Sequence, residues 1–381
     1  MAARSLLRLW CVGVALVVAA GCSPPTTELK ESGRFDGYKK ATADRLVEIE
    51  SELEGLDPKS RRQKLTELAL AEGGTVTIYG VTSLDDMSEQ IDAFEEATGL
   101  TVNYFRAGHE DVLQRVLEEA KAEFRGADAV NENGAEMAFI DNEGLLAPLD
   151  TPVAETTTRG DSGNWLWGFI DIYSAAWNTD LVSPAEAPKT WEDVLTNYEG
   201  QVLIDSGDVE WFATLVEDYF MAEKGMTEDE AVDFFRDAAK TSTFVDGHTF
   251  MADLVAAGEY KVAASPFRHG VIGLMGDDAP LAWEPAVEPL VARPEGMGVH
   301  ATAEHPASGL LFVEWYVTDG QAIGQGQDRQ PASSLVKGGG LPSEYESIVV
   351  DPDVVLEDYD KWLGLFNELI ELSGEDVIIE E

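Results

Sequence analysis

Short apolar runs alternate with amphipathic stretches along the chain from residue 74 onward. The apolar runs are rich in the β-branched and aromatic residues that strands favour. Between the first two runs, Met87, Ile91 and Phe94 recur at helical spacing, which predicts a helix. The strands predicted in this part of the chain are 75–79, 100–105, 127–130 and 137–140. Their alternation with helices predicts a parallel sheet that carries helices on its faces.

Two helices and a tether are predicted before this region. Apolar residues at helical spacing begin at Ala43, and Asp57 then caps a second helix that has a proline in its first turn. Gly73-Gly74 ends that second helix. Further upstream, residues 23–40 are rich in Pro, Thr, Ser, Gly and charge, a composition that is typical of a flexible tether.

Residues 168–182, at the centre of the chain, are predicted to be the point at which one α/β lobe ends and a second begins. Ile170 and Tyr173 favour a strand, and residues 177–180 then favour a turn. We expect this strand to form the floor of a cleft, and residues 288–292 to return the chain beside it. Beyond the centre, the predicted strands are 201–205, 260–264, 281–284 and 288–292, and the predicted helices are 191–195, 210–223, 227–239, 249–257, 308–317 and a stripe from Tyr359 to Ile370.

The charge balance of the chain excludes one class of partner. Seventy-two acidic residues face 26 basic ones among 381 residues, which gives a formal net charge of −46. Nucleic acid needs clustered Lys and Arg, so it is not an expected partner, and anionic lipid headgroups are disfavoured for the same reason. Adaptation to a salty medium is one explanation of the acidity, because salt screens the self-repulsion.

The first 22 residues have the pattern of a secretion signal. Arg4 and Arg8 precede a short apolar core at 9–20, which is too short to span a bilayer comfortably. Small residues then lead to Cys22, as in a bacterial lipobox, although Ala19 stands where Leu is commoner. We therefore expect Cys22 to be acylated and the protein to be anchored by lipid at the outer face of the bacterial membrane, in the periplasm or at the cell surface. An ordinary signal peptide with an incidental cysteine is the alternative.

Cysteine usage agrees with this expectation. Cys11 and Cys22 are the only cysteines, and Cys11 lies in the segment to be removed. The mature chain then has no disulfide, no thiol nucleophile and no cysteine-based zinc site.

Seven short segments carry a resemblance to a known family. They occur in the family's order between Leu65 and Gln321, namely at 74–80, 93–102, 144–148, 177–182, 188–194, 256–260 and 312–321. Together with the lipobox they resemble the extracellular solute-binding proteins of bacterial ABC importers, with the type 2 periplasmic-binding-protein fold, and most closely the ferric-iron-binding branch.

The resemblance implies a two-lobed α/β fold. Each lobe would be a mainly parallel sheet flanked by helices, and crossover hinge strands would join the lobes around a captured ligand. The expected partners are a small solute and an ABC permease, with no cofactor, and we expect a monomer. The predicted boundaries are 1–21 for the signal peptide, 22–42 for the lipidated tether, 43–73 for the N-terminal helices, 74–171 with 289–325 for lobe 1, 172–288 for lobe 2, and 326–381 for a C-terminal helical segment that packs across the lobes.

Loops that follow strands would point into the cleft, since ligands of open α/β sheets lie beyond the carboxyl ends of the strands. Each candidate has a structural alternative: a helix cap for Thr82, Ser83, Asp205 and Ser206, a solvated turn for the pair at 109–110, and core packing for Tyr173. The candidates from these loops and from the central strand are Thr82, Ser83, His109, Glu110, Tyr173, Asp205 and Ser206.

The loop from Ser265 to His269 is the most informative of these candidates. Arg268 and His269 follow a predicted strand in a chain with few basic residues. An arginine in a cleft suits a carboxylate or a phosphate, because its guanidinium can bind two oxygens, whereas the structural alternative is an ion pair with one of the many acidic side chains. Trp283 would add a wall, or would belong to the core.

The same loop argues against iron bound as in the ferric-binding relatives. The resemblance places adjacent tyrosines there, whereas this chain reads Pro266-Phe-Arg-His269. Ferric iron prefers anionic oxygen ligands, and Arg268 would repel it, although carboxylates could substitute. No metal site is predicted.

No motif of an enzyme is present. Histidine occurs only at positions 109, 248, 269, 300 and 305, and the chain lacks a His-Glu-x-x-His pair, a Gly-x-Ser-x-Gly elbow and a phosphate-binding Gly-x-x-x-x-Gly-Lys loop. We therefore predict a lipid-anchored solute receptor and favour a small organic anion as its solute. The alternatives are a protein of the same fold that binds ferric iron or another metal ion, and a structural or sensory lipoprotein.

Overall fold

The computed structural model describes residues 33–158, 160, 162–374 and 376–379. The chain divides into two units, Met1–Glu31 and Ser32–Glu381, and the description concerns the second. The predicted signal peptide, Cys22 and the start of the predicted tether lie outside the described residues. Among the described helices, none combines the length and apolar character that crossing a bilayer requires.

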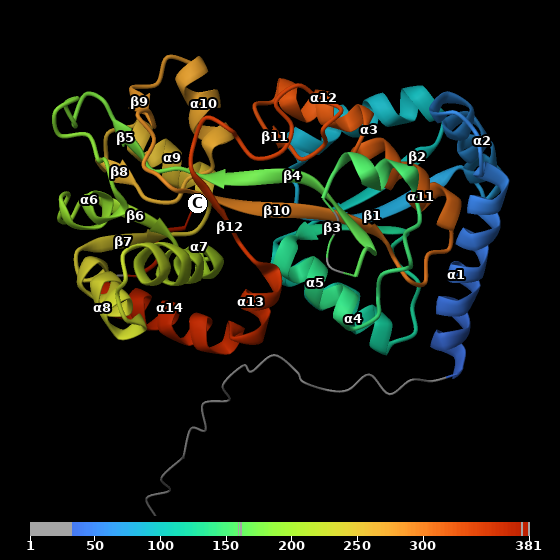
Figure 1. Ribbon diagram of the computed structural model, residues 1–381, viewed down its shortest axis with the longest axis horizontal. Helices are drawn as coiled ribbons and strands as arrows, with labels where there is room; N and C mark the ends of the chain where they lie inside the picture. Colours follow the sequence, from blue (N-terminus) through green and yellow to red (C-terminus); the bar gives the residue numbers. More distant parts are fainter. Residues whose placement is uncertain (1–32, 159, 161, 375, 380–381) are drawn as a thin grey trace, which may run out of the picture. The chain divides into compact units, whose positions relative to one another are not determined.

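The first lobe is built on a seven-stranded sheet with the order β11-β4-β10-β3-β1-β2, and β12 pairs with β10 (Figure 1). Strands β1, β2 and β3 are parallel, whereas β10 runs antiparallel to β3 and β4. The strands are β1 (Thr75–Gly80), β2 (Thr101–Arg106), β3 (Ala129–Asn133), β4 (Trp165–Tyr173), β10 (Leu290–Val299), β11 (Gln330–Pro331) and β12 (Ser347–Val349).

The helices of this lobe pack around a core that includes Phe94, Phe312 and Trp315. The predicted N-terminal cap of α2 is confirmed, since Asp57 accepts hydrogen bonds from the N–H groups of Lys59 and Ser60 at the start of this helix. The helices are α1 (Gly33–Leu53), α2 (Pro58–Ala71), α3 (Leu84–Thr98), α4 (His109–Lys121), α5 (Gly134–Asn142), η1 (Pro152–Thr156), α11 (Pro306–Tyr316) and α12 (Asp319–Gly326).

The second lobe is built on a five-stranded sheet with the order β7-β6-β8-β5-β9. Its strands are β5 (Ala176–Asn178), β6 (Val202–Asp205), β7 (Ser242–Val245), β8 (Val262–Ala263) and β9 (Leu281–Ala282). Its helices are α6 (Trp191–Thr196), α7 (Val209–Thr214), the π-helical stretch η2 (Leu215–Glu223), α8 (Glu228–Ala239), α9 (His248–Ala256), α10 (Arg268–Gly276), α13 (Pro352–Glu357) and α14 (Tyr359–Ser373).

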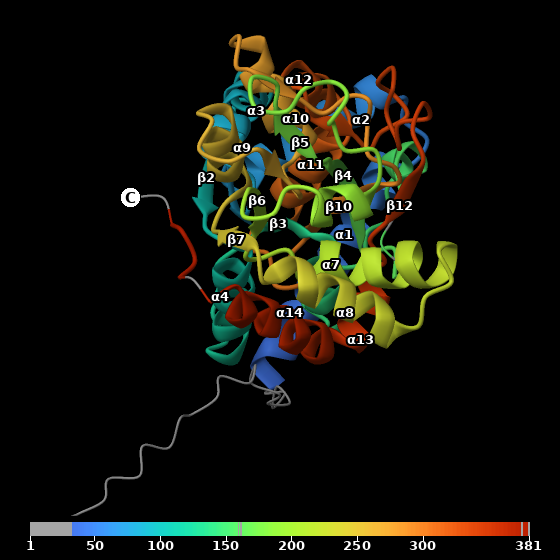
Figure 2. The same cartoon turned by 90° about the vertical axis from the view of Figure 1, so that its left-hand side faces the viewer.

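Aromatic side chains hold the second lobe together. The ring of Phe212 makes edge-on contacts with Phe235, at 4.9 Å between centroids, and with Trp362 of α14, at 5.7 Å. Figure 2 shows α14 lying beside α7 and α8. The C-terminal helix is therefore part of the second lobe's core, while α13 contacts α5 of the first lobe.

Two long strands carry the chain between the sheets. Strands β4 and β10 pair antiparallel, with Tyr173 opposite Val291 and Ile172 opposite Ala292 (Figure 1). The predicted return of the chain beside the central strand is therefore confirmed. The register shifts between Glu295 and Gly296, because Gly168 of β4 has no partner in β10 and forms a bulge in β4.

The two-lobed α/β class is confirmed, but one predicted strand and the mainly parallel sheets were wrong, and one strand of the second lobe was missed. Residues 137–140, predicted as a strand, lie in α5, where Met137 and Ile140 are both buried; a short apolar run cannot distinguish a buried strand from a buried helix. The strand β7 was missed. Both sheets are mixed rather than mainly parallel, because β5, β9, β10 and β11 pair antiparallel with their neighbours.

Two boundaries also differ from the expectation. Helix α1 already begins at Gly33, inside the segment predicted as a tether. The segment 326–381, predicted as helical, also contributes β11 and β12 to the first sheet.

A buried ion network attaches the N-terminal helices to the first lobe. Arg61 of α2 is 6% exposed and bonds Glu50 of α1, at 2.9 Å and 2.7 Å, and Glu314 of α11, at 3.0 Å from Nε to Oε1. The hydroxyl of Thr151 donates to the same Glu314 carboxylate. Removing the arginine would leave buried carboxylates without their counter-ion, which is far costlier than losing a surface pair.

We expect Arg61→Ala to lower the free energy of unfolding by about 3–5 kcal/mol. The matched control is its neighbour Arg62, whose partner Asp319 is exposed, so that Arg62→Ala should cost less than about 1 kcal/mol. Urea unfolding followed by circular dichroism measures both. Equal, small losses for the two variants would contradict the account of the network.

Candidate functional site: a cavity between the two lobes

A cavity of about 450 Å³ lies between the lobes, a size in the usual range for small-ligand sites. Its walls come from the loops after β1, β2, β6, β7 and β8 and from residues of β3, β4 and β10. The carboxyl ends of the parallel strands in both sheets therefore meet at one place, as the rule for open α/β sheets requires.

The first-lobe wall begins with Thr82 and Ser83, after β1. Ser83 caps α3, since its Oγ accepts the N–H of Asp86 at 3.1 Å. The hydroxyl of Thr82 donates to Asn131 Oδ1 at 2.8 Å. Arg106, at the end of β2, lines the cavity as an exposed side chain, and no described residue forms an ion pair with it. Among the arginines that line the cavity in the described part of the chain, it is the one without a carboxylate partner.

His109 follows on the same wall, as the first residue of α4. Its Nδ1 lies 3.0 Å from Glu136 Oε1 of α5. Burial by itself lowers the pKa of His109, but the hydrogen bond and charge of Glu136 outweigh it and raise the pKa to about 9. Arg293 opposes this rise and Glu210 of α7 adds to it. The imidazole is therefore protonated at neutral pH.

The second-lobe wall consists of Asp205, Gly207 and residues 246–250, with Phe267 and His269 beyond them. Asp205 accepts the N–H groups of Gly207, at 2.8 Å, and Gly247, at 2.7 Å. The ring of His248 stacks on Phe267, with 3.9 Å between ring centroids and an interplanar angle of 17°. These contacts fix the wall before any ligand arrives.

The crossing strands form the floor. Arg293 of β10 bonds Asp171 of β4 at 3.0 Å and lies 3.7 Å from Glu210 of α7. Near the bulge, Arg329 pairs with Glu295, which also accepts from Asn131 at 2.7 Å. Both arginines are thus already neutralised by carboxylates on neighbouring elements.

Carboxyl groups also lie buried behind the floor. Burial and the nearby charge of Glu136 raise the pKa of Glu210 to about 7, and burial raises the pKa of Glu132 well above its usual value. One carboxylate oxygen in each of Glu132, Glu136 and Glu210 has no hydrogen-bond partner among the described residues. This acidic group spans both lobes, since Glu132 and Glu136 lie in the first and Glu210 in the second.

Two helices from opposite lobes begin at the cavity. Helix α4 starts after Gly108 and α9 after Gly247, and glycine has no side chain with which to cap a helix. Gly247 has φ +110°, a conformation that strains any other residue. The first N–H groups of a helix lack partners inside it and carry partial positive charge, so both starts are suited to an anion.

The structure brings five of the predicted side chains together in the cavity wall and leaves six outside it. Those in the wall are Thr82, Ser83, His109, Asp205 and His269. Those outside it are Glu110, Tyr173, Ser206, Ser265, Arg268 and Trp283.

Four of the six residues outside the wall, Tyr173, Ser265, Arg268 and Trp283, are buried or bonded elsewhere in the fold. Tyr173 is fully buried, 5.2 Å from the ring of Phe267. Arg268 donates to Gln330 at 2.7 Å and stacks over Trp283, so it points away from the cavity. Ser265 is also fully buried, whereas Glu110 is exposed on α4.

Sequence reasoning missed Arg106, Arg293 and Arg329, and with them His248. The missed strand β7 concealed the loop that carries His248, since a strand at 242–245 would have marked 246–250 as a cleft loop. Arg293 directly follows the predicted strand 288–292, and a charged residue within a hinge strand was a usable signal. The sequence around Arg329 contained no such signal, because tertiary packing alone brings this residue to the cavity.

Residues 89–329 match the sequence pattern of a protein family described as "Bacterial extracellular solute-binding protein". The chain belongs to this family. The matched segment contains most of the cavity wall, including the starts of α4 and α9. No curated protein matches the sequence.

Solved structures of this solute-binding fold resemble the chain at low sequence identity, and therefore show the fold alone. Iron-bound HitA from Pseudomonas aeruginosa is 17% identical, with a TM-score of 0.66, covering 77% of this chain and 99% of its own. AfuA from Actinobacillus pleuropneumoniae, with fructose-6-phosphate bound, is 17% identical, with a TM-score of 0.65, covering 79% and 99%. MotA from A. tumefaciens B6, in complex with glucopine, is 15% identical, with a TM-score of 0.61, covering 78% and 99%.

The chain is therefore a member of a family described as bacterial extracellular solute-binding proteins. The family and these neighbours are binding proteins rather than enzymes. These three structures contain iron, fructose-6-phosphate and glucopine, respectively.

The His109–Glu136 pair should make stability depend on pH. The pKa of His109 is raised to about 9 in the folded chain, against about 6.5 in the unfolded chain. The stabilisation of the folded state by the charged pair is therefore fully present below about pH 6.5 and is lost as the pH rises through about 9. We expect the difference in unfolding free energy between wild type and His109→Gln to shrink from pH 7 to pH 10, as measured by urea unfolding.

His300 provides the control for this measurement. Burial lowers its pKa to about 4, so that it is neutral throughout the same window. The difference between wild type and His300→Gln should stay flat between pH 7 and pH 10. A His109→Gln difference that is equally flat would contradict the assignment.

Proposed function

We propose that this protein captures a small anionic solute in the cavity and delivers it to a membrane permease of the ABC type. The observation that carries the proposal is the pair of glycine-led helix starts, α4 and α9, which face the cavity from opposite lobes. An anion held by N–H groups of both starts would favour closure of the lobes around it.

The side chains of the cavity support a negative solute despite the acidity of the chain. Asp171 is paired with Arg293, and Glu295 with Arg329, so these carboxylates are compensated within the protein. Arg106 is exposed on the wall without an ion pair in the described chain. Contacts inside a closed cavity outweigh the distant surface charge, which salt screens.

Arg106 takes the role that the sequence suggested for Arg268. Its guanidinium suits a carboxylate or phosphate oxygen, and charge-assisted hydrogen bonds are the strong ones. Among the similar solved structures, that of AfuA contains bound fructose-6-phosphate, an anionic solute. Ferric iron held by tyrosines is a poorer fit, since no tyrosine is among the described residues that line the cavity.

A thermal-shift screen tests the solute class. We expect phosphates, sugar phosphates or small carboxylates to raise the unfolding temperature, and amines, neutral sugars and Fe³⁺ to have smaller effects. Arg106→Ala should then weaken the best anion about 10- to 100-fold by calorimetry, as follows from losing a charged hydrogen bond of about 1.5–3 kcal/mol.

Arg268→Ala is the matched control, because Arg268 lies beside the cavity but does not line it. Its anion affinity should match that of wild type. Stabilisation by amines alone, or equal anion affinity in the Arg106→Ala protein, would refute an anionic solute.

We also propose that Cys22 is acylated and tethers the mature protein to the membrane. In cells of a bacterial host, Cys22→Ser should move the protein from the membrane fraction to the soluble fraction and abolish incorporation of labelled palmitate. Cys11→Ser should change neither, because Cys11 lies in the removed segment. Membrane retention of the Cys22→Ser protein would contradict the anchor.

A further inference from the structure

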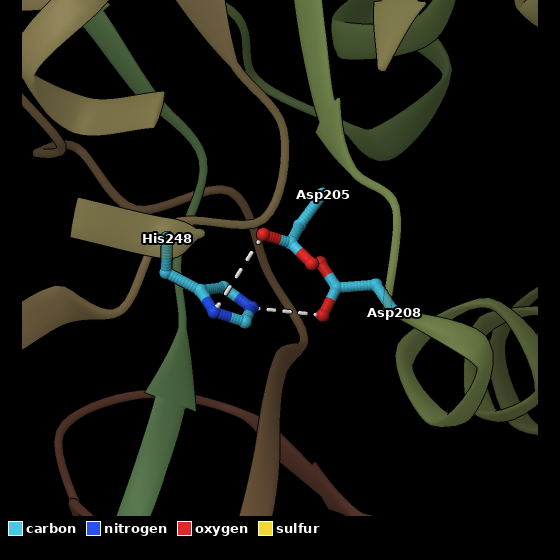
Figure 3. A group of neighbouring side chains, drawn as sticks. All are labelled: Asp205, Asp208 and His248. Carbon is cyan, nitrogen blue, oxygen red and sulfur yellow. Dashed lines mark hydrogen bonds and ion pairs between the residues drawn. The ribbon is translucent and has the colours of Figure 1, made fainter. Parts of the chain in front are cut away.

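Three potential metal ligands meet at the second-lobe wall of the cavity. Asp205 ends β6, Asp208 lies just before α7, and His248 begins α9. Strands β6 and β7 are parallel neighbours with Asp205 opposite Val245, and this register brings the loops that follow them together. Figure 3 shows the imidazole turned toward both carboxylates.

The three side chains are close enough to bind one ion. His248 Nε2 lies 2.9 Å from Asp208 Oδ1, and His248 Nδ1 lies 3.8 Å from Asp205 Oδ2. One ligand atom from each of the three residues lies within 4.8 Å of the others. Ligand atoms this close together can share one ion, which would take one of the two ring nitrogens of His248.

One oxygen of the group lacks a partner, which points to a missing ligand. Asp208 is 1% exposed, and its Oδ2 has no hydrogen-bond partner among the described residues. In Figure 3 this second oxygen is directed at the carboxylate of Asp205. A buried, unpartnered oxygen beside another carboxylate is costly, and a cation between them would remove that cost.

The protein holds the ligands in place from behind. Asp205 accepts two backbone N–H groups, from Gly207 and Gly247, and Phe267 stacks on the His248 ring. Such supporting contacts orient the ligands of metal sites. Asp205 and His248 also line the cavity, so an ion could enter from there and would keep coordination positions open toward it.

The donor set selects the kind of ion. One imidazole and two carboxylates suit a divalent first-row transition metal such as Zn²⁺ or Mn²⁺, whereas Mg²⁺ and Ca²⁺ prefer oxygen ligands alone. We propose that Asp205, Asp208 and His248 bind one such ion at the second-lobe wall. The ion would add positive charge beside the start of α9, where the anionic solute is proposed to bind.

The test uses metal alone, so that its outcome does not depend on whether the solute is an anion. The purified full chain is treated with a chelator and titrated with Zn²⁺, Mn²⁺ and Mg²⁺ by calorimetry, at high ionic strength to suppress weak binding by surface acids. We expect one equivalent of Zn²⁺ or Mn²⁺ to bind, and Mg²⁺ to bind far more weakly.

Two variants test the ligands. Asp208→Asn and His248→Gln should each weaken binding at least about 10-fold, the size of effect found even for groups that only support metal ligands. Asp237→Asn is the control, because this exposed aspartate of the same lobe pairs only with Lys240 among the described residues. Its affinity for the metal should equal that of wild type.

X-ray absorption spectroscopy of the zinc-loaded protein provides a second measurement, which remains informative even where the Asp208→Asn variant does not fold. The spectrum should contain imidazole scattering that His248→Gln removes and that His269→Gln, elsewhere in the same cavity wall, retains. Absence of stoichiometric binding, or binding that both ligand variants leave unchanged, would overturn the proposal; His248 would then be only a structural partner of the two aspartates.

Discussion

The antiparallel pairing of β4 with β10 is the constraint on which the rest of the structure depends. These strands lie inside the first sheet, between β11 and β3, and carry the chain to and from the second lobe; their paired residues include Tyr173 with Val291. Because their backbone groups are bonded to each other, the two crossings can bend together but cannot separate. We therefore expect any relative movement of the lobes to be concentrated where the strands leave the first sheet, at the floor of the cavity.

The electrostatics of the floor follow from this constraint. Arg293 is held between Asp171 of β4 and Glu210 of the second lobe, so one guanidinium links the crossing strands to the second lobe. The buried carboxyl groups behind it come from both lobes, and burial together with their mutual repulsion disfavours full ionisation. Charge is thus matched closely along the crossing strands, which leaves the helix starts and Arg106 as the groups that the proposed solute would meet.

Much of the fold could be predicted from local signals, whereas the site could be predicted only in part. The cap at Asp57 and the return strand at 288–292 depend on short-range pattern, and both are confirmed. The strand predicted at 137–140 was wrong because a helix that is buried on most sides shows no helical periodicity of apolar residues. Arg268 was the favoured arginine, yet its side chain turns to Trp283, while Arg106 and His248 face the cavity. Side-chain direction depends on tertiary packing, which a sequence pattern does not record.

The distance between the lobes tests the central claim most directly. Spin labels at Lys121 of α4 and at Lys240, which follows α8, would report it in a chain whose two native cysteines are replaced. With an anion that stabilises the protein, pulsed dipolar spectroscopy should show one narrow distance distribution, shifted from that of the free chain. A saturating, bound anion that leaves the distribution unchanged would contradict capture by closure of the two lobes.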